Sequence, residues 1–278
     1  MLTQLLLTMM VFLSILSGLS GCNETALAAT QVQVLELPGQ RTPSPPATTT
    51  PKISAQQQAA KASFLMGKAA AEKQFITIAD KYASRKGMVM HPEAYEAFRR
   101  MHKAAQAEGI RLVIKSATRN FNYQRRIWNG KWTGRRKVEG KDLSKIIADR
   151  RQRALKILEN SSMPGSSRHH WGTDIDLNAF NNDYFRRGQG KREYAWLQAN
   201  ATRFGFCQPY TPKGVGRDSG YHEERWHWTY MPLSRQYTRE AALYLKDELF
   251  SDFEGADTAP EIGIVQNYVL GINQKCLE

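Results

Sequence analysis

Apolar residues recur at helical spacing along much of the chain after residue 61. The clearest case follows residues 91–93, where a proline occupies the expected first helical turn. Its apolar face comprises Ala94, Phe98, Met101 and Ala105, and Gly109 marks its expected end. Three further amphipathic segments predict helices over residues 143–160, 194–204 and 235–250.

Alternation of apolar and polar residues predicts three short strands. In residues 110–115, isoleucine, leucine and isoleucine alternate with polar or smaller residues, which gives one mainly apolar face. Residues 173–178 and 225–230 carry two more strand signals. Helices and strands in this irregular order predict an α+β fold, with a small antiparallel sheet flanked by helices. We expect one domain over residues 61–250, followed by a C-terminal tail over 251–278.

The first residues read as an export signal. Residues 5–19 form an apolar run about as long as the core of a signal peptide, although no lysine or arginine precedes it. The following residues, ending at Cys22, resemble a bacterial lipobox, in which the cysteine is lipidated and becomes the new N-terminus. We expect a signal peptide with a lipobox over residues 1–22. The alternatives are cleavage after residues 26–28, which gives simple secretion, and an uncleaved anchor.

Residues 23–60 lack hydrophobic periodicity. The stretch 41–51 is rich in proline and threonine and cannot build a core. We therefore expect a disordered tether that lets a lipid-anchored domain reach into the cell wall.

The formal net charge of the chain is +13. A basic surface favours polyanions such as nucleic acid, anionic lipid headgroups or anionic wall polymers. Since an exported protein rarely meets nucleic acid, we expect a partner in the envelope and no nucleic acid. The alternative is a basic soluble surface with no dedicated partner.

Two cysteines remain if Cys22 carries lipid. An oxidising compartment then permits one disulfide between Cys207 and Cys276, which would tie the C-terminal tail to the domain. The alternative is that Cys207, within the apolar run 204–207, is a buried free thiol.

Residues 167–176 contain side chains that bind metals. His169 and Asp176 lie seven residues apart with Gly172 between them, so a turn can bring both to one point. In the strand after the glycine, Asp174 and Asp176 share one face. Neutral imidazole and carboxylate oxygen are both good zinc ligands, and this segment therefore predicts part of a zinc site.

A second cluster occupies residues 224–230. In a regular strand, His227 and Thr229 face one way, whereas Trp226, Trp228 and Tyr230 face the other. Glu224 would then lie on the wrong face for joint action with His227. A catalytic Glu224 therefore requires the strand to begin after it, with Glu224 on a bent loop.

His169, Asp176 and His227 would leave the fourth tetrahedral position of a zinc ion open to water, as a catalytic site requires. Zinc lowers the pKa of such a water towards about 7. Glu224 is the natural group to take the proton of the water and to pass it to the leaving amine. A cation must stabilise the developing oxyanion, and Arg119, just past the strand at 110–115, is the candidate.

These motifs resemble a known family. The pattern Ser167-x-His169-x-x-Gly172-x-x-x-Asp176, with Glu224-x-Trp226-His227 downstream, closely resembles the zinc D-Ala-D-Ala carboxypeptidases of the VanY type. Those enzymes share a fold with lysostaphin-type peptidases and the Hedgehog signalling domain. Ser116-x-Thr118-Arg119 followed by Gln124 resembles the arginine segment of that family. The resemblance covers roughly residues 85–235.

The resemblance implies a role for each of seven residues. It implies that zinc is held by His169, Asp176 and His227. It implies that Glu224 is the general base and acid, and that Arg119 binds the scissile carbonyl or the terminal carboxylate. Ser167 and Gln124 would help to hold the substrate.

Asp174 departs from the family pattern, which often has alanine at this position. Its carboxylate could bond a ligand histidine, line the substrate site or coordinate zinc. His170 and His222 lie beside the motifs but outside the pattern, so we expect them to support the ligands or to be solvated. Trp128 and Trp132 could line the substrate groove or pack beneath it.

We therefore expect a zinc-dependent D,D-carboxypeptidase that hydrolyses the terminal D-Ala-D-Ala bond of peptidoglycan stem peptides. L,D-carboxypeptidase and endopeptidase action are alternatives, because the ligands do not discriminate among them. A non-catalytic peptidoglycan-binding module, or a basic protein with a structural metal completed by Asp174, is a further alternative.

We expect a monomer on the periplasmic side of the envelope. Asn23 rather than aspartate follows Cys22, which favours anchoring to the outer membrane through the lipid. A secreted periplasmic protein is the alternative.

Overall fold

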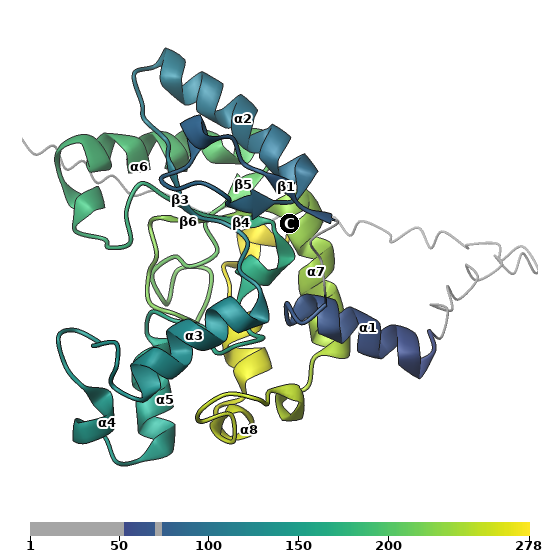
Figure 1. Ribbon diagram of the computed structural model, residues 1–278. Helices are drawn as coiled ribbons and strands as arrows, with labels where there is room; N and C mark the ends of the chain where they lie inside the picture. Colours follow the sequence, from purple (N-terminus) through teal and green to yellow (C-terminus); the bar gives the residue numbers. More distant parts are fainter. Residues whose placement is uncertain (1–52, 70–73) are drawn as a thin grey trace, which may run out of the picture. The chain divides into compact units, whose positions relative to one another are not determined.

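A four-stranded antiparallel sheet carries both predicted motifs in the computed structural model, which describes residues 53–69 and 74–278 (Figure 1). Its strands lie in the order β3-β4-β6-β5, and their bounds are β3 Ile114–Ser116, β4 Asp174–Leu177, β5 Phe206–Cys207 and β6 His227–Tyr230. The register between β4 and β6 pairs Asp176 with His227 and Asp174 with Thr229. The two motifs, far apart in sequence, therefore lie side by side. A separate two-stranded sheet pairs β1 (Ile76–Thr77) with β2 (Val89–Met90).

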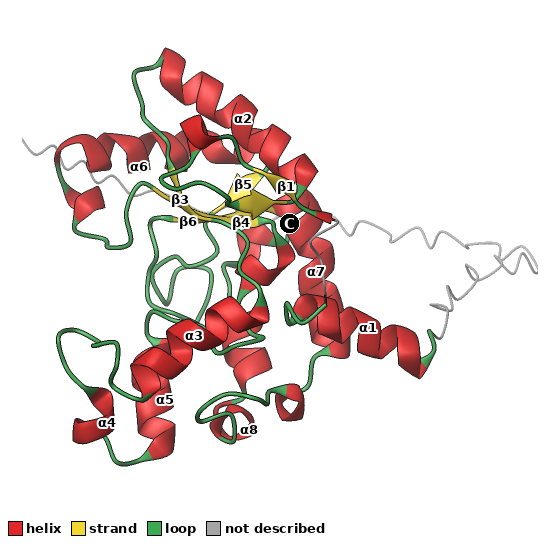
Figure 2. Ribbon diagram, in the orientation of Figure 1, coloured by secondary structure: helices red, strands yellow, loops and turns green. Residues whose placement is uncertain are grey.

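Helices lie on both sides of the four-stranded sheet (Figure 2). The α-helices are α1 Ala55–Leu65, α2 Pro92–Ala107, α3 Phe121–Trp132, α4 Leu143–Ile146, α5 Arg150–Leu158, α6 Gly188–Asn200, α7 Met231–Tyr244 and α8 Thr258–Ile262. Short 3-10 or π turns are η2 Asp80–Tyr82, η3 Arg168–Trp171, η4 Tyr184–Arg186, η5 Ala201–Phe204, η6 Asp247–Leu249, η7 Val265–Val269 and η8 Gln274–Cys276. The expected α+β class with a small antiparallel sheet is confirmed. None of the helices in the described residues is long and apolar enough to cross a membrane.

The two faces of the sheet differ in character. Ile175 and Leu177 of β4, with Trp228 and Tyr230 of β6, join a hydrophobic core that also takes in α2 and α6. Burial of such aliphatic and aromatic side chains contributes about 1.5–3 kcal/mol each and holds the two helices against the sheet. The alternation of side chains in a strand then directs the polar residues of β4 and β6 to the opposite face, where the site lies.

Some predicted elements differ from those observed. The helix expected over residues 143–160 is wrong: the chain forms α4 and α5, because Ile147 adopts an extended conformation and Asp149 caps α5 through Gln152. The strand expected over 110–115 begins only at Ile114. The helix expected over 235–250 begins at Met231 and ends at Tyr244. The helix expected over 194–204 begins earlier, at Gly188, and continues as η5 to the left-handed Gly205.

The boundary of the predicted tether also changes. Helix α1 begins at Ala55, inside the segment 23–60, because Ser54 and Gln57 form a capping box in a run of alanine and glutamine. The helix packs against α7, where the rings of Phe64 and Tyr237 lie 5.2 Å apart. The predictions for residues 1–52, including the signal peptide and the lipid on Cys22, lie outside the described residues.

The C-terminal segment belongs to the body of the domain. Ile262, Ile264, Val269 and Ile272 are buried in the core that also contains α3, α5 and α7. Cys276 forms a disulfide with Cys207 of β5. The region after residue 250 is therefore a packed strap and not a detached tail, and it supports the strand next to β6.

We expect the double variant Cys207→Ser/Cys276→Ser to lose up to about 4 kcal/mol of unfolding free energy, because the disulfide closes a loop with a sequence separation of 69 residues. Urea unfolding of the oxidised protein and the variant measures this loss. Added reductant should lower the midpoint of the native protein and leave that of the variant unchanged. Equal midpoints for the two proteins would contradict a stabilising role for the bridge.

Candidate metal centre

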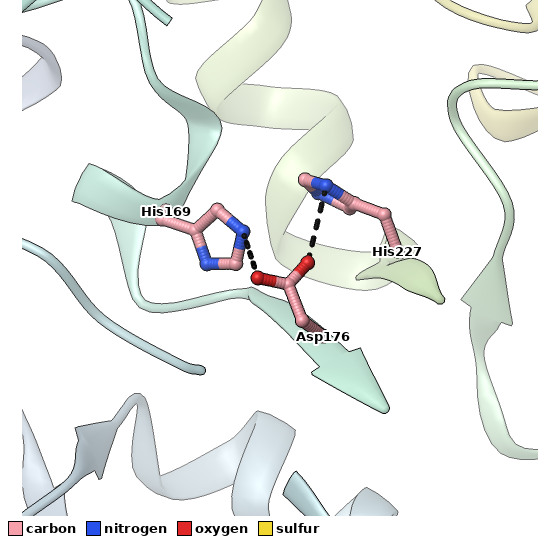
Figure 3. A group of neighbouring side chains, drawn as sticks. All are labelled: His169, Asp176 and His227. Atoms are coloured by element: carbon pink, nitrogen blue, oxygen red, sulfur yellow. Dashed lines mark ion pairs between the residues drawn. The ribbon is translucent and has the colours of Figure 1, made fainter. Parts of the chain in front are cut away.

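Two histidines and an aspartate meet on the polar face of the sheet (Figure 3). His169 lies in η3, Asp176 in β4, and His227 is the first residue of β6. Each offers one ligand atom, and these atoms all lie within 4.8 Å of one another. The Nε2 atom of His169 is 3.3 Å from Asp176 Oδ2, and the Nδ1 atom of His227 is 3.5 Å from Asp176 Oδ1. Ligand atoms that share a tetrahedral zinc at about 2.0–2.2 Å stand about 3.3–3.6 Å apart, so this spacing fits a shared ion.

Gly172 makes the turn that joins two of these residues. It ends η3 with φ of 73°, a left-handed conformation that favours glycine. A Cβ atom at this position would lie 2.4 Å from a ring carbon of Phe75 and 3.1 Å from the backbone nitrogen of His91. The glycine therefore allows the chain to reverse between His169 and β4.

Unpaired buried atoms mark the point where the three side chains converge. The Nε2 atom of His169 and the Oδ1 atom of Asp176 have no hydrogen-bond partner among the described residues. The opposite nitrogen of each histidine is held: Nδ1 of His169 donates to the carbonyl of Ala117 at 2.8 Å, and Nε2 of His227 donates to Asp174 at 2.9 Å. Metal-binding histidines are oriented in this way. The residues thus fit a divalent cation, and a donor set of two imidazoles and one carboxylate favours zinc.

Asp174 orients His227 and is not one of the three converging residues. Its buried carboxylate accepts hydrogen bonds from Arg168 at 3.3 Å, Thr229 at 2.6 Å and Thr173 at 2.8 Å, besides that from His227. Burial alone would raise the pKa of Asp174, but Arg168 and His227 hold it below its ordinary value. The sequence left three roles open for Asp174: a bond to a histidine of the centre, a place in the substrate site, or coordination of zinc. The geometry favours the bond to a histidine, His227.

The two histidines of the candidate metal centre have opposite pKa shifts. Burial lowers the pKa of His169, with the positive charge of Arg119 acting in the same direction. Burial also disfavours charge on His227, but its hydrogen bonds to Asp174 and Glu224 prevail and raise its pKa to about 9. In the metal-free protein at neutral pH, His169 is ready to coordinate, whereas His227 carries a proton that a metal ion must displace.

We expect the affinity for Zn²⁺ to rise by about tenfold per pH unit between pH 7 and 9, since binding releases one proton from His227, and to level off above its pKa. Titration calorimetry in two buffers of different ionisation enthalpy counts the released protons. The variant Asp174→Asn removes the carboxylate on Nε2 and should release fewer protons at pH 7.5. Zinc binding without proton release at that pH in the native protein would contradict the assignment.

Glu224 stands beside the metal-facing nitrogen of His227. Its Oε2 atom accepts a hydrogen bond from Nδ1 of His227 at 2.9 Å. The strand begins only at His227, and Glu224 lies on the bent segment before it, as the sequence required of a catalytic residue at this position. Its backbone nitrogen donates to the carbonyl of Tyr210 at 2.9 Å, which fixes that bend. The carboxylate is thus buried next to the candidate metal.

The three expected substrate-binding residues offer unpaired polar atoms near this centre. Nε of Arg119, Oγ of Ser167 and Oε1 of Gln124 are buried without hydrogen-bond partners among the described residues. Ser167 precedes η3 but its side chain makes no cap, so turn capping does not account for it. The backbone nitrogen of Arg119 donates to the carbonyl of His169 at 3.1 Å, which holds the arginine segment against the ligand turn.

Two cavities meet at Arg119 and Glu224, which line both. The smaller has a volume of about 40 Å³, and it is lined by polar side chains that include Gln124 and Tyr221. The larger is a groove of about 590 Å³ that also reaches Asp176. The candidate metal centre therefore borders a small cavity through His227 and a larger one through Asp176.

Of the tryptophans and histidines near the motifs, some lie in the hydrophobic core and others lie beside the candidate metal centre. Trp128 and Trp132 belong to α3, where they are buried in the core and do not line the groove. Trp226 is 8% exposed and lines the groove, whereas Trp228 packs in the core. His170 is buried and its Nδ1 donates to the carbonyl of Arg119 at 2.6 Å.

Sequence reasoning missed three residues of the site. Arg168 bonds Asp174, Thr229 and Thr238 from a fully buried position. Tyr210 packs its ring edge against His227, with the ring centres 4.8 Å apart. Tyr221 lines the small cavity and packs on Tyr210 at 4.9 Å. These tyrosines lie outside the recognised motifs, and no spacing signal pointed to them.

Comparison with known proteins places these residues in a family pattern. The family model described as "VanY: D-alanyl-D-alanine carboxypeptidase" matches residues 87–233, which is more than half of the chain and includes His169, Asp176 and His227. A D-alanyl-D-alanine carboxypeptidase of Enterococcus faecalis is 28% identical over 130 residues, which cover 47% of this chain and 44% of that protein. The chain spans about half the length of the curated relatives that it matches.

Two solved structures are similar at lower identity. A mutant of the vancomycin-resistance D,D-pentapeptidase VanY in complex with Zn(II) matches with a TM-score of 0.44 and 22% identity, covering 61% of this chain and 83% of that one. The LD-carboxypeptidase LdcB matches with a TM-score of 0.42 and 24% identity, covering 56% and 67%.

Proposed function

Because this chain belongs to the VanY family of D-alanyl-D-alanine carboxypeptidases, we propose that it is a zinc-dependent D,D-carboxypeptidase acting on peptidoglycan stem peptides. The observation that carries the proposal is the convergence of His169, Asp176 and His227 on one point with the carboxylate of Glu224 beside it. A cluster with three protein ligands, open on the side of a groove, is typical of catalytic and not structural zinc.

Zinc would be held by Nε2 of His169, Nδ1 of His227 and the carboxylate of Asp176. When bound, the ion supplies a Lewis acid that polarises the scissile carbonyl and acidifies water. Asp174 and the carbonyl of Ala117 keep the two imidazoles in the orientation that this requires.

Glu224 performs the proton transfers of peptide hydrolysis. Its carboxylate takes a proton from the attacking water and returns it to the leaving amine of the terminal residue. Arg119 lies between the two cavities and offers an unpaired Nε to the oxygen on which negative charge develops. The backbone nitrogen of each residue is hydrogen-bonded, which fixes the segment from which its side chain reaches the centre.

The unequal cavities support cleavage at a chain end. The small space beside Arg119 and Glu224 leaves no room for an extended chain, whereas the groove of about 590 Å³ can take the rest of a stem peptide. An endopeptidase needs room for an extended chain on both sides of the scissile bond. The small compartment therefore favours release of a terminal residue.

Three purified substrates separate the related activities. Stem pentapeptide, stem tetrapeptide and a crosslinked dimer are incubated with the zinc-loaded protein, and the products are identified by mass spectrometry. We expect release of one alanine from the pentapeptide. Cleavage confined to the tetrapeptide would indicate L,D-carboxypeptidase action, and conversion of the dimer alone to monomers would indicate an endopeptidase.

The proposal includes a location at the periplasmic side of the outer membrane, with lipid on Cys22 and a monomeric domain on a tether. The lipobox resemblance and the peptidoglycan substrate of the family support it. Mass spectrometry of the mature N-terminus tests the anchor. A diacylglyceryl cysteine supports it, whereas an unmodified chain that begins at Ala29 indicates simple secretion.

A further inference from the structure

The groove beside the metal centre has a strongly basic lining. Besides Arg119, four cationic side chains from separate segments line it: Arg85 before β2, Lys115 in β3, Lys131 in α3 and Arg136 after α3. We call these four residues the basic wall. The carboxylates that line the same groove are Asp176 and Glu224, both committed to the candidate metal and its chemistry.

The basic wall lacks carboxylate partners within the described residues. None of its four cations takes part in an ion pair there. Nearby lysines that do not line the groove behave differently: Lys137 pairs with Asp142 at 3.4 Å, and Lys156 pairs with Glu159 at 2.6 Å. The charge of the basic wall is thus not balanced by ion pairs, in contrast to that of Lys137 and Lys156.

Neutral groups hold some of these cations in place. The side chain of Lys131 is partly buried and donates to the hydroxyl of Ser161. The guanidinium of Arg85 stands 5.6 Å from the centre of the Tyr123 ring, a cation–π contact that leaves its charge uncompensated. A divalent ion at the metal centre would neutralise Asp176 and Glu224, and the wall would then remain as an uncompensated positive surface.

We propose that the basic wall binds free carboxylates of the stem peptide on the acyl side of the scissile bond, and so selects substrates by their negative charge. The inference rests on the proposed function, since it takes the groove to hold the peptide ahead of the terminal D-alanine. Two carboxylates can supply this charge. One is the α-carboxylate of a γ-linked glutamate at the second position, and the other is the second carboxylate of a diaminodicarboxylic acid at the third.

Four matched pentapeptides test the proposal. They carry either diaminopimelic acid or lysine at the third position, each with the glutamate carboxylate free or amidated. We expect the native protein to prefer the most acidic peptide, with a loss of about 3–10-fold in kcat/KM for each carboxylate removed, mainly through KM. The preference should weaken at high salt, because the groove is open to solvent. If kcat/KM falls when the glutamate is amidated, the wall binds that carboxylate. If it falls when lysine replaces diaminopimelic acid, the wall binds the carboxylate at the third position.

The double variant Arg85→Gln/Arg136→Gln should reduce this discrimination while retaining its zinc and its thermal unfolding midpoint. The double variant Lys137→Gln/Lys156→Gln makes the same change of charge outside the groove and should discriminate as the native protein does. Equal kcat/KM for all four peptides would overturn the proposal. So would an unchanged preference in the variant of Arg85 and Arg136.

Direct binding separates this inference from the proposed function. Titration calorimetry with the four peptides is repeated on Glu224→Gln, which should bind without turnover. Tighter binding of the acidic peptides to this variant supports the basic wall even if the native protein cleaves none of them. Cleavage of all four peptides at the same rate, with equal affinities, supports the proposed function and refutes the wall.

Discussion

Replacing Glu224 with glutamine is expected to lower kcat by about 10²–10⁴-fold while zinc remains bound. The amide keeps the size of the side chain and leaves the backbone bond to Tyr210 in place, but it cannot accept a proton from water. Glu224 is not one of the three converging ligands, so metal content should not fall. Rates of alanine release from the stem pentapeptide and zinc analysis of the same sample measure both effects.

The neighbouring acid provides the matched control. Glu223 pairs with Arg225 at 3.0 Å and has no contact with the metal-facing atoms, so Glu223→Gln should keep kcat within a few-fold of the native value. If Glu224→Gln retained more than a tenth of the native kcat, a different group would have to be the base.

Replacing His169 with glutamine is expected to remove bound zinc and to reduce activity below about 1% of the native rate. Loss of a residue that only orients a ligand already costs about 10–100-fold in metal affinity, and loss of a ligand should cost more. The ring of His169 supplies the unpaired Nε2 atom at the centre, whereas the neighbouring His170 of η3 uses both ring nitrogens in hydrogen bonds to the backbone of Arg119 and Gly165. Metal analysis after dialysis against a weak chelator gives the stoichiometry.

The exposed His222 is the control for this change, because it lies two residues before Glu224 but outside the converging group. His222→Gln should retain one equivalent of zinc. Urea unfolding of both metal-free variants should show that His169→Gln remains folded. One equivalent of tightly bound zinc in folded His169→Gln would remove this residue from the ligand set.

Local patterns predicted the parts of the fold that depend on local interactions. The apolar spacing from Ala94 to Ala105 indicated α2, and the alternation in β4 and β6 correctly separated Asp176 and His227 from the core face. The break in the predicted helix at Ile147 could not be found in this way. It depends on the extended backbone at Ile147 and on the cap supplied by Asp149, which also reads as an ordinary position on a charged helix face.

In the candidate site, too, the sequence predicted the residues of short motifs but not the contacts that depend on the folded chain. Spacing and family resemblance indicated His169, Asp176, His227 and Glu224, because each motif is short in sequence. The role of Asp174 could not be chosen until the register of β4 and β6 brought it to Nε2 of His227. The basic wall was also hidden, since its residues come from four segments that meet only in the folded chain.

An anomalous diffraction map of zinc-loaded crystals, recorded at the zinc absorption edge, tests the central claim most directly. We predict one peak about 2.0–2.2 Å from Nε2 of His169, Nδ1 of His227 and a carboxylate oxygen of Asp176. A peak that omitted one of these atoms, or zinc bound only elsewhere on the protein, would contradict the assignment and the peptidase mechanism built on it.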